Sequence, residues 1–458
     1  MTLQLVFFLT LVLINVAMAF TIGIAGKAHK QVIIENTLPK EHLEDAAVLN
    51  LVKKFRRSLW ILAILGCLLG LSLFFLSKES FMMTSFWLCL LFALGGSYAV
   101  EIRYIRKMHD LKVAKGWQLP VAPVVIDTKL IQAKNRKLVP FIALLPAFVL
   151  TLLYCGWLWQ LKADNFLVLS ASALGFWILS VALWFAIKRL PVRPITKEAT
   201  INQQLNDITK HTWSLMMVTL PYFLLVLLYL PQLSMETKGL QATILAIFFP
   251  LLLCGFLLYT VGMLLHLRKR QDQLLNQVAD YRYTGEDQYW RFAMYNNPND
   301  SRIMVPDRIG LNIGINLGRP MGKVLGIGTL LAIFGLMIGT LIPLYRMDFV
   351  KDSFSAQLTY DTLTLDAPFA KESRIPLNQI QSVELVDKLP KKTVRTNGYG
   401  GDHYLTGEFK VADKKASLYL TLEKKPYLHV VTKNRDYYFS SQEEKTTALY
   451  QEIQTATK

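Results

Sequence analysis

The sequence has few cysteines and few charged residues, and these two shortages exclude several classes of protein. The 458 residues include four cysteines, Cys67, Cys89, Cys155 and Cys254, and all four fall inside apolar runs. The C-terminal segment therefore has no disulfide framework, and no CxxC pair is present to hold zinc. Charged residues make up 18% of the chain, whereas a soluble domain has roughly 25%. The chain is therefore not a soluble protein built on one large core.

The motifs of common catalytic and nucleotide-binding sites are also missing. The sequence contains no GxSxG and no HExxH, and a P-loop is excluded because Gly322-Lys323 is followed by Val324. Its 7 histidines are scattered and show no ligand spacing to one another. From these absences we expect a non-enzymatic protein with no catalytic residue, no metal site and no cofactor.

Long apolar runs dominate what is present. Apolar residues make up 53% of the chain, and the mean hydropathy is +0.32. A transmembrane helix needs ~20 mostly apolar residues. Eight runs meet this need, at 3–25, 59–76, 81–100, 138–159, 166–187, 212–230, 240–266 and 324–345. No Asp, Glu, Lys or Arg falls inside them. We predict an α-helical polytopic membrane protein with about eight transmembrane helices.

Two of these assignments have alternatives. Ala17-Met18-Ala19 resembles a signal-peptide cleavage site, but residues 1–25 contain no Lys or Arg, which favours an uncleaved anchor. The runs 59–76 and 81–100 are joined by four residues only, 77–80. Two tightly connected spans are the preferred interpretation of this pair, and a short re-entrant hairpin is the alternative.

The charges of the loops indicate an orientation. Loops 27–58, 101–137, 188–211 and 267–323 carry 7, 9, 5 and 9 Lys and Arg residues, and the loops between them carry one each. The positive-inside rule then places the four basic loops in the cytoplasm and both termini outside the cell membrane. The net charge of +17 is therefore a signal of topology and of contact with the lipid bilayer. Nucleic acid is not an expected partner.

These boundaries divide the chain into ten segments. Four are cytoplasmic: an amphipathic loop at 27–58, a basic loop at 101–137, a linker at 188–211 and a loop domain at 267–323. Five contain the spans, at 1–26, 59–100, 138–187, 212–266 and 324–345, and the tail is 346–458. Within the first loop, Pro39 is placed to start a helix and Thr37 to cap it.

The loop domain contains a motif of turn-forming and charged residues. Its members are Asn297, Pro298, Asp300, Arg302, Pro306, Arg308 and Arg319. Asn-Pro followed by Asn-Asp is a turn signal, because Asx side chains bond the nearby backbone. We interpret the motif as structural, with its arginines setting turns and pairing with headgroups. Residues 309–317 alternate with strand period and predict a β-ribbon, whereas Gly322, Gly326, Gly335 and Gly339 predict helix packing.

The tail has the pattern of a small β-barrel closed by a helix. The β-prone runs are 355–360, 363–365, 372–376, 380–385, 404–411, 416–422, 427–432 and 436–439. A helix is expected from about Ser441, with Leu449, Tyr450 and Ile453 on its apolar face. This layout fits an α+β domain of the pleckstrin-homology (PH) type. The glycine-rich segment 395–403 is a candidate recognition loop through Arg395, Asn397, Tyr399 and His403, and the alternative is a hairpin connection that binds nothing.

The same residues carry a resemblance to a known group. Ile375–Val383, Tyr437–Phe439 and the helix Glu443–Ile453 resemble bacterial PH-type domains. The loop Asn297-Pro298…Asp300-x-Arg302…Val305-Pro306-x-Arg308…Gly318-Arg319-Pro320 resembles a domain of unknown function in multi-pass membrane proteins of Gram-positive bacteria. Thr37–Pro39 and the stretch Gly116-Trp117…Val125–Thr128 are similar to the same group. It is distantly similar to membrane proteins that give immunity to secreted toxins, and its members are largely uncharacterised.

Two functional hypotheses follow. The first is a binding, sensing or immunity-type envelope protein that acts through its PH-like domain on another membrane protein or a secreted peptide. The second is a permease for a small solute, in which Pro221 and Pro250 break the sixth and seventh spans. Ion-coupled transport usually requires ionisable residues at membrane depth, and the apolar runs contain no Asp, Glu, Lys or Arg.

Overall fold

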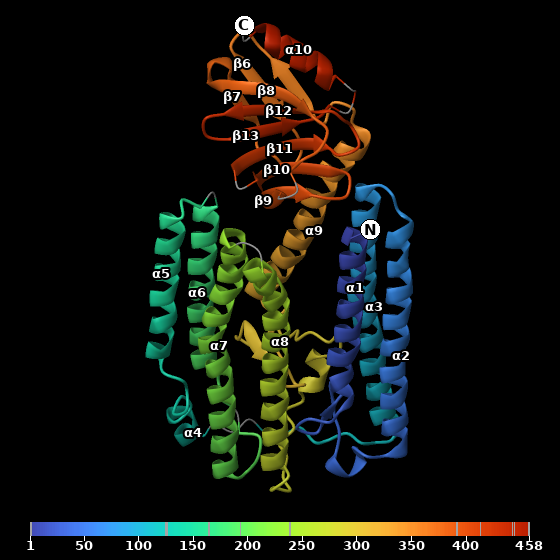
Figure 1. Cartoon of the computed structure of the whole chain (residues 1–458). Coiled ribbons are helices and arrows are strands. Elements are labelled where there is room, and N and C mark those ends of the chain that lie inside the picture. The colour runs from blue at the N-terminus through green and yellow to red at the C-terminus, as the bar shows by residue number, and fades with distance from the viewer. Residues whose placement is uncertain are drawn as a thin grey trace. The chain divides into compact units, whose positions relative to one another are not determined.

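A computed structural model describes residues 2–456 apart from 124–126, 164, 193, 238–239, 391–392, 413, 442 and 444. Its long helices are α1 (Thr2–Gly23), α2 (Ala46–Gly70), α3 (Glu79–Ala114), α5 (Leu145–Gln160), α6 (Phe166–Arg189), α7 (Ala199–Glu236), α8 (Leu240–Leu275) and α9 (Pro320–Phe349) (Figure 1). In the described part of the chain, 8 helices are long and apolar enough to cross a membrane. At most 33% of each apolar stretch is buried within the protein. The apolar surface that remains is typical of helices that face lipid, as the apolar runs predict.

Short elements connect the helices. The 3-10 helices are η1 (Ile24–Gly26), η2 (Lys40–His42), η3 (Leu71–Phe75), η4 (Phe141–Leu144) and η5 (Glu286–Tyr289). The other short elements are β1 (Val32–Ile33), β2 (Asn36–Thr37), α4 (Thr128–Gln132), β3 (Met304–Pro306) and β4 (Ile313–Ile315). The strands pair as two antiparallel hairpins, β1 with β2 and β3 with β4. Residues 124–126 of the stretch that resembles the Gram-positive group lie outside the described residues.

The chain forms two compact units that alternate along the sequence. The first unit comprises Met1–Ala19, Trp60–Ser97 and Gly328–Lys458, and the second comprises Phe20–Leu59 and Tyr98–Ile327. In the first unit, Leu11, Leu73, Met82 and Cys89 form a buried cluster. The indole Nε1 of Trp87 on α3 donates a hydrogen bond of 3.1 Å to Thr340 Oγ1 on α9.

In the second unit, α5 packs on α6, α6 on α7, and α7 on α8. Leu144, Trp184 and Val218 form a buried cluster there. Helix α7 continues through Pro221, and α8 is one helix from Leu240 to Leu275. The two prolines therefore do not break these spans, because the helix hydrogen bonds on either side hold each segment together.

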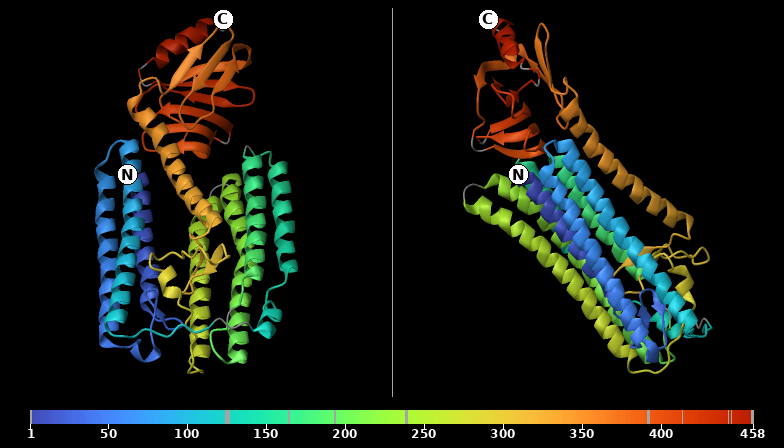
Figure 2. Two further views of the ribbon diagram at one scale, coloured as in Figure 1. Left: turned by 180° about the vertical axis from the view of Figure 1, so that it is seen from behind. Right: turned by 90° about the vertical axis from the view of Figure 1, so that its right-hand side faces the viewer.

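The first unit ends in a separate sheet-rich domain (Figures 1 and 2). Its strands are β5 (Ser355–Leu358), β6 (Thr362–Asp366), β7 (Ser373–Pro376), β8 (Ile380–Val386), β9 (Thr393–Gly400), β10 (Tyr404–Val411), β11 (Lys414–Thr421), β12 (Tyr427–Thr432) and β13 (Asp436–Phe439). Three strands form a sheet in the order β5-β6-β7, and six form a second sheet in the order β8-β12-β13-β11-β10-β9. The helix α10 (Thr446–Ala456) packs on β5, β8 and β12. Its residues Leu449 and Ile453 complete a core with Tyr419, Leu428 and Val430.

Several sequence expectations need correction. The helix expected from Ser441 begins at Thr446, although Ser441 Oγ does accept a hydrogen bond from the backbone N–H of Glu443. Glu444 lies outside the described residues. The first-loop helix begins at Ala46 and not at Pro39, because Asp45 Oδ1 accepts the N–H of Ala47 and so caps the helix.

The ribbon predicted over 309–317 forms in part, whereas the helix packing predicted for Gly322, Gly326, Gly335 and Gly339 is wrong among the described residues. The ribbon forms, but β4 is shorter than expected and pairs with Met304–Pro306. A Cβ at Gly322 would overlap the carbonyl oxygen of Asn316, so this position requires glycine. Among the described residues, no heavy atom apart from the adjacent backbone of α9 lies within 4 Å of the Cβ position at Gly335 or Gly339. These two glycines therefore do not pack against another helix in the structure.

Candidate functional site

A buried cluster of charges joins four segments of the second unit. Its centre is Asp287 on η5, which is 7% exposed. Its carboxylate accepts hydrogen bonds from Lys112 Nζ at 2.7 Å, Arg308 Nη2 at 2.7 Å and Thr37 Oγ1 at 2.8 Å. The backbone N–H of Thr37 donates to the same group at 3.1 Å. These contacts tie the β1–β2 hairpin, the end of α3, η5 and the turn after β3 together.

The electrostatics of the cluster keep Asp287 ionised. Burial by itself would raise the pKa of Asp287, but the positive charge of Arg308 and the hydrogen bond from Lys112 outweigh burial. The pKa of Asp287 is therefore lower than that of an ordinary aspartate. The guanidinium of Arg308 is fully engaged on this side, since its Nη1 also donates to the carbonyl of Glu35 at 2.8 Å.

The surroundings of Glu35, which lies beside this cluster, shift the pKa of its carboxyl group in the opposite direction. Its side chain is buried, and its Oε2 has no hydrogen-bond partner within the described part of the chain. Burial, followed by the negative charge of Asp307, raises the pKa of Glu35 well above its usual value. The nearby Arg308 lowers it by less. Ionisation is disfavoured in this position, because it would leave a poorly compensated charge out of water.

The structure brings most of the loop motif together as a folded turn. Asn297 and Asn316 hold each other, with Asn316 Oδ1 accepting the N–H of Asn297 at 3.0 Å and Asn316 Nδ2 donating to Asn297 O at 2.9 Å. Asp300 accepts from Arg302 Nε at 2.8 Å and from Tyr295 Oη at 2.9 Å. Arg319 Nη1 reaches the carbonyl of Pro298 at 3.4 Å. Pro306 ends β3, two residues before Arg308. Each motif side chain that donates or accepts here bonds within the protein, and Arg302 and Arg308 pair with carboxylates of the protein in place of the expected headgroups.

The candidate recognition residues lie on a strand and the turn after it, and not on a mobile loop. Residues Thr393–Gly400 form β9, which pairs with β10. This strand is an edge of the six-stranded sheet. Arg395 and Asn397 are exposed on it, whereas Tyr399 is half-buried against the ring of Phe369 at 5.2 Å. The sequence pattern missed β9 because its glycines and polar residues are depleted in strands.

Tyr399 and His403 contact the helical part of the same unit. The hydroxyl of Tyr399 donates to Glu79 Oε2 at 2.5 Å, and the N–H of His403 donates to Glu79 Oε1 at 2.8 Å. Glu79 is the first residue of α3 and is 2% exposed. A Cβ at Gly401 would overlap its carboxylate, so any larger residue there would displace the Glu79 side chain.

Two further polar contacts support this junction. Asp348 at the end of α9 accepts from the N–H of Ser80 at 2.8 Å and from Tyr404 Oη at 3.0 Å. The ammonium of Lys78 lies 3.6 Å from the centre of the Phe349 ring. The β9–β10 turn is thus held against the first turn of α3 and the last turn of α9.

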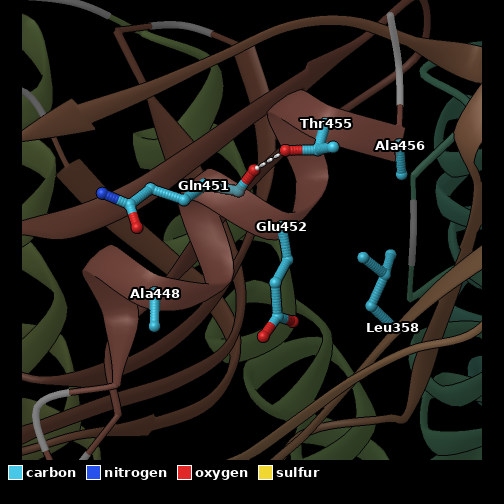
Figure 3. A pocket seen from close by; sticks show the side chains of 6 residues that line it. All are labelled: Leu358, Ala448, Gln451, Glu452, Thr455 and Ala456. Carbon is cyan, nitrogen blue, oxygen red and sulfur yellow. Dashed lines mark hydrogen bonds between the residues drawn. The ribbon is translucent and has the colours of Figure 1, made fainter.

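A depression beside α10 offers less chemistry. It is lined by Leu358, Ala448, Gln451, Glu452, Thr455 and Ala456 (Figure 3). The residues that α10 contributes are exposed, and Thr455 Oγ1 already donates to the carbonyl of Gln451 within the helix. In the described ranges, no group of His, Cys, Asp or Glu side chains is arranged to hold a metal ion.

Sequence reasoning missed the partners that organise these sites. Lys112, Asp287 and Glu35 come from three segments that are far apart in the chain, and none stands in a recognisable motif. In the sequence, Glu79 is only one charged residue of the short connection 77–80. Its position at the first turn of an apolar helix was the one available signal, since a carboxylate there is stabilised by the helix dipole.

Two protein-family models match parts of the chain. Residues 355–453 match the bacterial PH domain family, which covers β5 to α10 of the sheet-rich domain. Residues 298–323 match a family of unknown function (DUF5808), which covers the folded turn and β3–β4. No curated protein matches the chain, and no solved structure does. The described part of the chain thus has a helical region with 8 candidate membrane spans, followed by a sheet-rich domain at the position of the PH domain match.

Proposed function

We propose that this chain is a non-enzymatic, multi-pass protein of the cell membrane that binds or senses a partner through its PH domain. The partner is an extended segment of another membrane protein or a secreted peptide, and immunity to a secreted toxin is one form of this role. The resemblance to multi-pass proteins of Gram-positive bacteria supports a bacterial envelope as the setting. In the described chain, no observation favours the permease alternative.

One observation carries the proposal. Strand β9 is an edge of the six-stranded sheet, and its far end is attached to α3 through Tyr399 and Glu79. An edge strand presents unpaired N–H and C=O groups, so an extended peptide can add to the sheet there. The exposed side chains of Arg395 and Asn397 would then contact the added segment. A peptide bound to β9 would lie next to a contact that ends on a membrane-spanning helix.

The test places a photo-crosslinking amino acid at single positions of the full chain in the cells that produce it. We expect partner adducts from positions 395 and 397 on β9. Position 374 on β7 is the matched control, because Arg374 is also an exposed strand arginine but lies in the three-stranded sheet. Absence of adducts at both β9 positions, or equal adducts at position 374, contradicts binding at this edge.

A further inference from the structure

The second unit contains a cavity that the PH-domain function does not use. Its volume is about 260 Å³. It lies among the last turn of α6, the connection 190–195, the first turns of α7, the end of α8 and the segments 281–286 and 302–308. This volume is below the ~300 Å³ at which pockets for drug-sized ligands begin. The cavity is therefore suited to a small group and not to a large organic ligand.

Positive charge is the main chemical feature of the lining. Its five basic side chains are Lys30, Lys210, Arg282, Arg302 and Arg308, and its two acidic side chains are Glu286 and Asp307. Three of the five cations are already engaged. Arg302 is paired with Asp300 and Arg308 with Asp287. Lys210 Nζ donates to the carbonyls of Ile187 and Leu190 at 2.5 and 2.9 Å, at the C-terminal end of α6.

Arg282 and Lys30 are the remaining two basic side chains of the lining. Arg282 Nη1 is buried and has no hydrogen-bond partner among the described residues. The Lys30 side chain lines the same cavity, and its charge also interacts with the carboxyl groups of Asp272 and Asp307. The carboxyl groups of Glu286 and Asp307 in the lining offset part of this charge, and burial raises the pKa of Asp307. A buried donor without a partner, such as Arg282 Nη1, is costly, so a missing acceptor is the simplest completion of the cavity.

We propose that this cavity is a binding site for a phosphate group, held by Arg282 and Lys30. A guanidinium and an ammonium together satisfy the oxygens of a phosphate by charge-assisted hydrogen bonds. Trp213 also lines the cavity, and tryptophan is enriched where a membrane meets water. The phosphate therefore belongs either to a lipid headgroup or to a soluble ion, and both sources share this chemistry.

The experiment titrates the full chain, purified in a neutral detergent, with two probes at constant ionic strength. The probes are inorganic phosphate and a short-chain phosphatidylglycerol, with the zwitterionic short-chain phosphatidylcholine for comparison. We expect saturable binding of at least one anionic probe. Arg282→Gln and Lys30→Gln should each weaken it by about tenfold or more, the usual effect of losing one charged hydrogen bond. Arg291→Gln is the matched control, since Arg291 is exposed and is not part of the cavity lining.

The outcomes of the titration distinguish the two sources of the phosphate group. Binding of phosphatidylglycerol alone identifies a lipid headgroup, and binding of inorganic phosphate identifies a soluble ion. No saturable binding of either probe, or equal affinity in the wild type and both cavity variants, overturns the proposal. If a cavity variant does not fold, the tryptophan fluorescence of the wild type and of Trp213→Phe is followed during the same titration. The difference between the two signals reports binding in the intact cavity. Absence of a saturable change in that difference overturns the proposal as well.

Discussion

At the scale of single residues, the second unit depends on charges that have no access to water. Asp287 accepts from Lys112, Arg308 and Thr37, and all of these side chains are nearly buried. A buried ion pair adds little net stability compared with apolar packing, because desolvation offsets the attraction. Removal of one partner is different, since it leaves the other charges buried and unpaired.

Asp287→Asn should therefore destabilise the second unit strongly. The substitution keeps the shape of the side chain but removes the charge that compensates Arg308 and Lys112. We expect a loss of about 3 kcal/mol, typical of a broken buried pair, and a clear fall in the thermal unfolding midpoint of the full chain in detergent. Asp110→Asn is the control, since Asp110 is exposed. Equal midpoints for the two variants would show that the cluster does not stabilise the fold.

His29 provides a pH dependence at the same scale. Its side chain is 1% exposed and its Nδ1 lies 2.9 Å from Asp272 Oδ1. Burial lowers the pKa of His29 to about 4, although Asp272 opposes this shift. The unfolded chain therefore binds a proton at this position as the pH falls below 6.5, while the folded chain does not until about pH 4. The contribution of His29 to stability is complete above pH 6.5 and is lost progressively between pH 6.5 and 4.

The expected loss across that window is about 3 kcal/mol. The measurement is the thermal midpoint of wild type and His29→Gln at several pH values between 4 and 7. Glu35 gives the opposite pH dependence of stability, because its pKa is raised in the folded state. The informative quantity is therefore the difference in thermal midpoint between the wild type and His29→Gln. This difference should shrink as the pH falls. The exposed His211 is the control position, and a difference that is independent of pH would refute the assignment.

At the scale of elements, the helices do more than cross a membrane. Helix α3 has 36 residues and is therefore about 54 Å long, well beyond the ~30 Å of a bilayer core. One end carries Glu79, which holds the β9–β10 turn, and the other end carries Lys112, which pairs with Asp287. The polar ends of a spanning helix thus take part in the folded structures at both of its termini.

Gly401→Ala should release the β9–β10 turn from α3. The added Cβ would overlap the carboxylate of Glu79, so this side chain must shift and lose its hydrogen bonds from Tyr399 and His403. Gly400→Ala is a close control, because its Cβ would meet Arg395 and Leu405 at 3.6 Å, an ordinary contact distance. Hydrogen exchange measured by mass spectrometry should show faster exchange at 399–404 and 79–83 in Gly401→Ala only. Identical exchange in the two variants would mean that the junction does not hold the turn.

At the scale of the whole molecule, the orientation in the membrane decides which partners the PH domain can meet. The basic loops 27–58, 101–137, 188–211 and 267–323 predict that both termini are outside. The folded loop motif and the proposed phosphate site would then face the cytoplasm, where anionic lipids are abundant. The edge strand β9 would instead face partners outside the cell.

A single cysteine at position 360 tests this orientation. Tyr360 is fully exposed in the turn between β5 and β6, so a cysteine there does not disturb the core. After replacement of the four native cysteines, a membrane-impermeant maleimide should label Tyr360→Cys in intact cells. A cysteine at Asp110, on the basic side, should be labelled only after lysis. The reverse pattern would place the PH domain in the cytoplasm and redirect the search for its partner.

The sequence alone determined the features that depend on composition and on local periodicity. The apolar runs predicted the eight spans because a bilayer requires ~20 apolar residues whatever the helices contact. The alternating runs of the tail predicted eight of the nine strands of the PH domain and its closing helix, since one face of each is buried. The turn motif from Asn297 to Arg319 was also visible, because Asn, Asp and Pro act on their own backbone.

Only the tertiary structure decided which distant residues meet. The buried contacts join segments that are separated by tens to hundreds of residues. They are the contacts of Asp287 with Lys112, Arg308 and Thr37, the contact of Glu79 with Tyr399, and the cavity that Arg282 lines. No local period encodes such pairs, since the energy of a buried charge depends on its surroundings and not on its neighbours in sequence. For the same reason β9 was missed, because its pairing with β10 overrides the weak strand preference of its glycines.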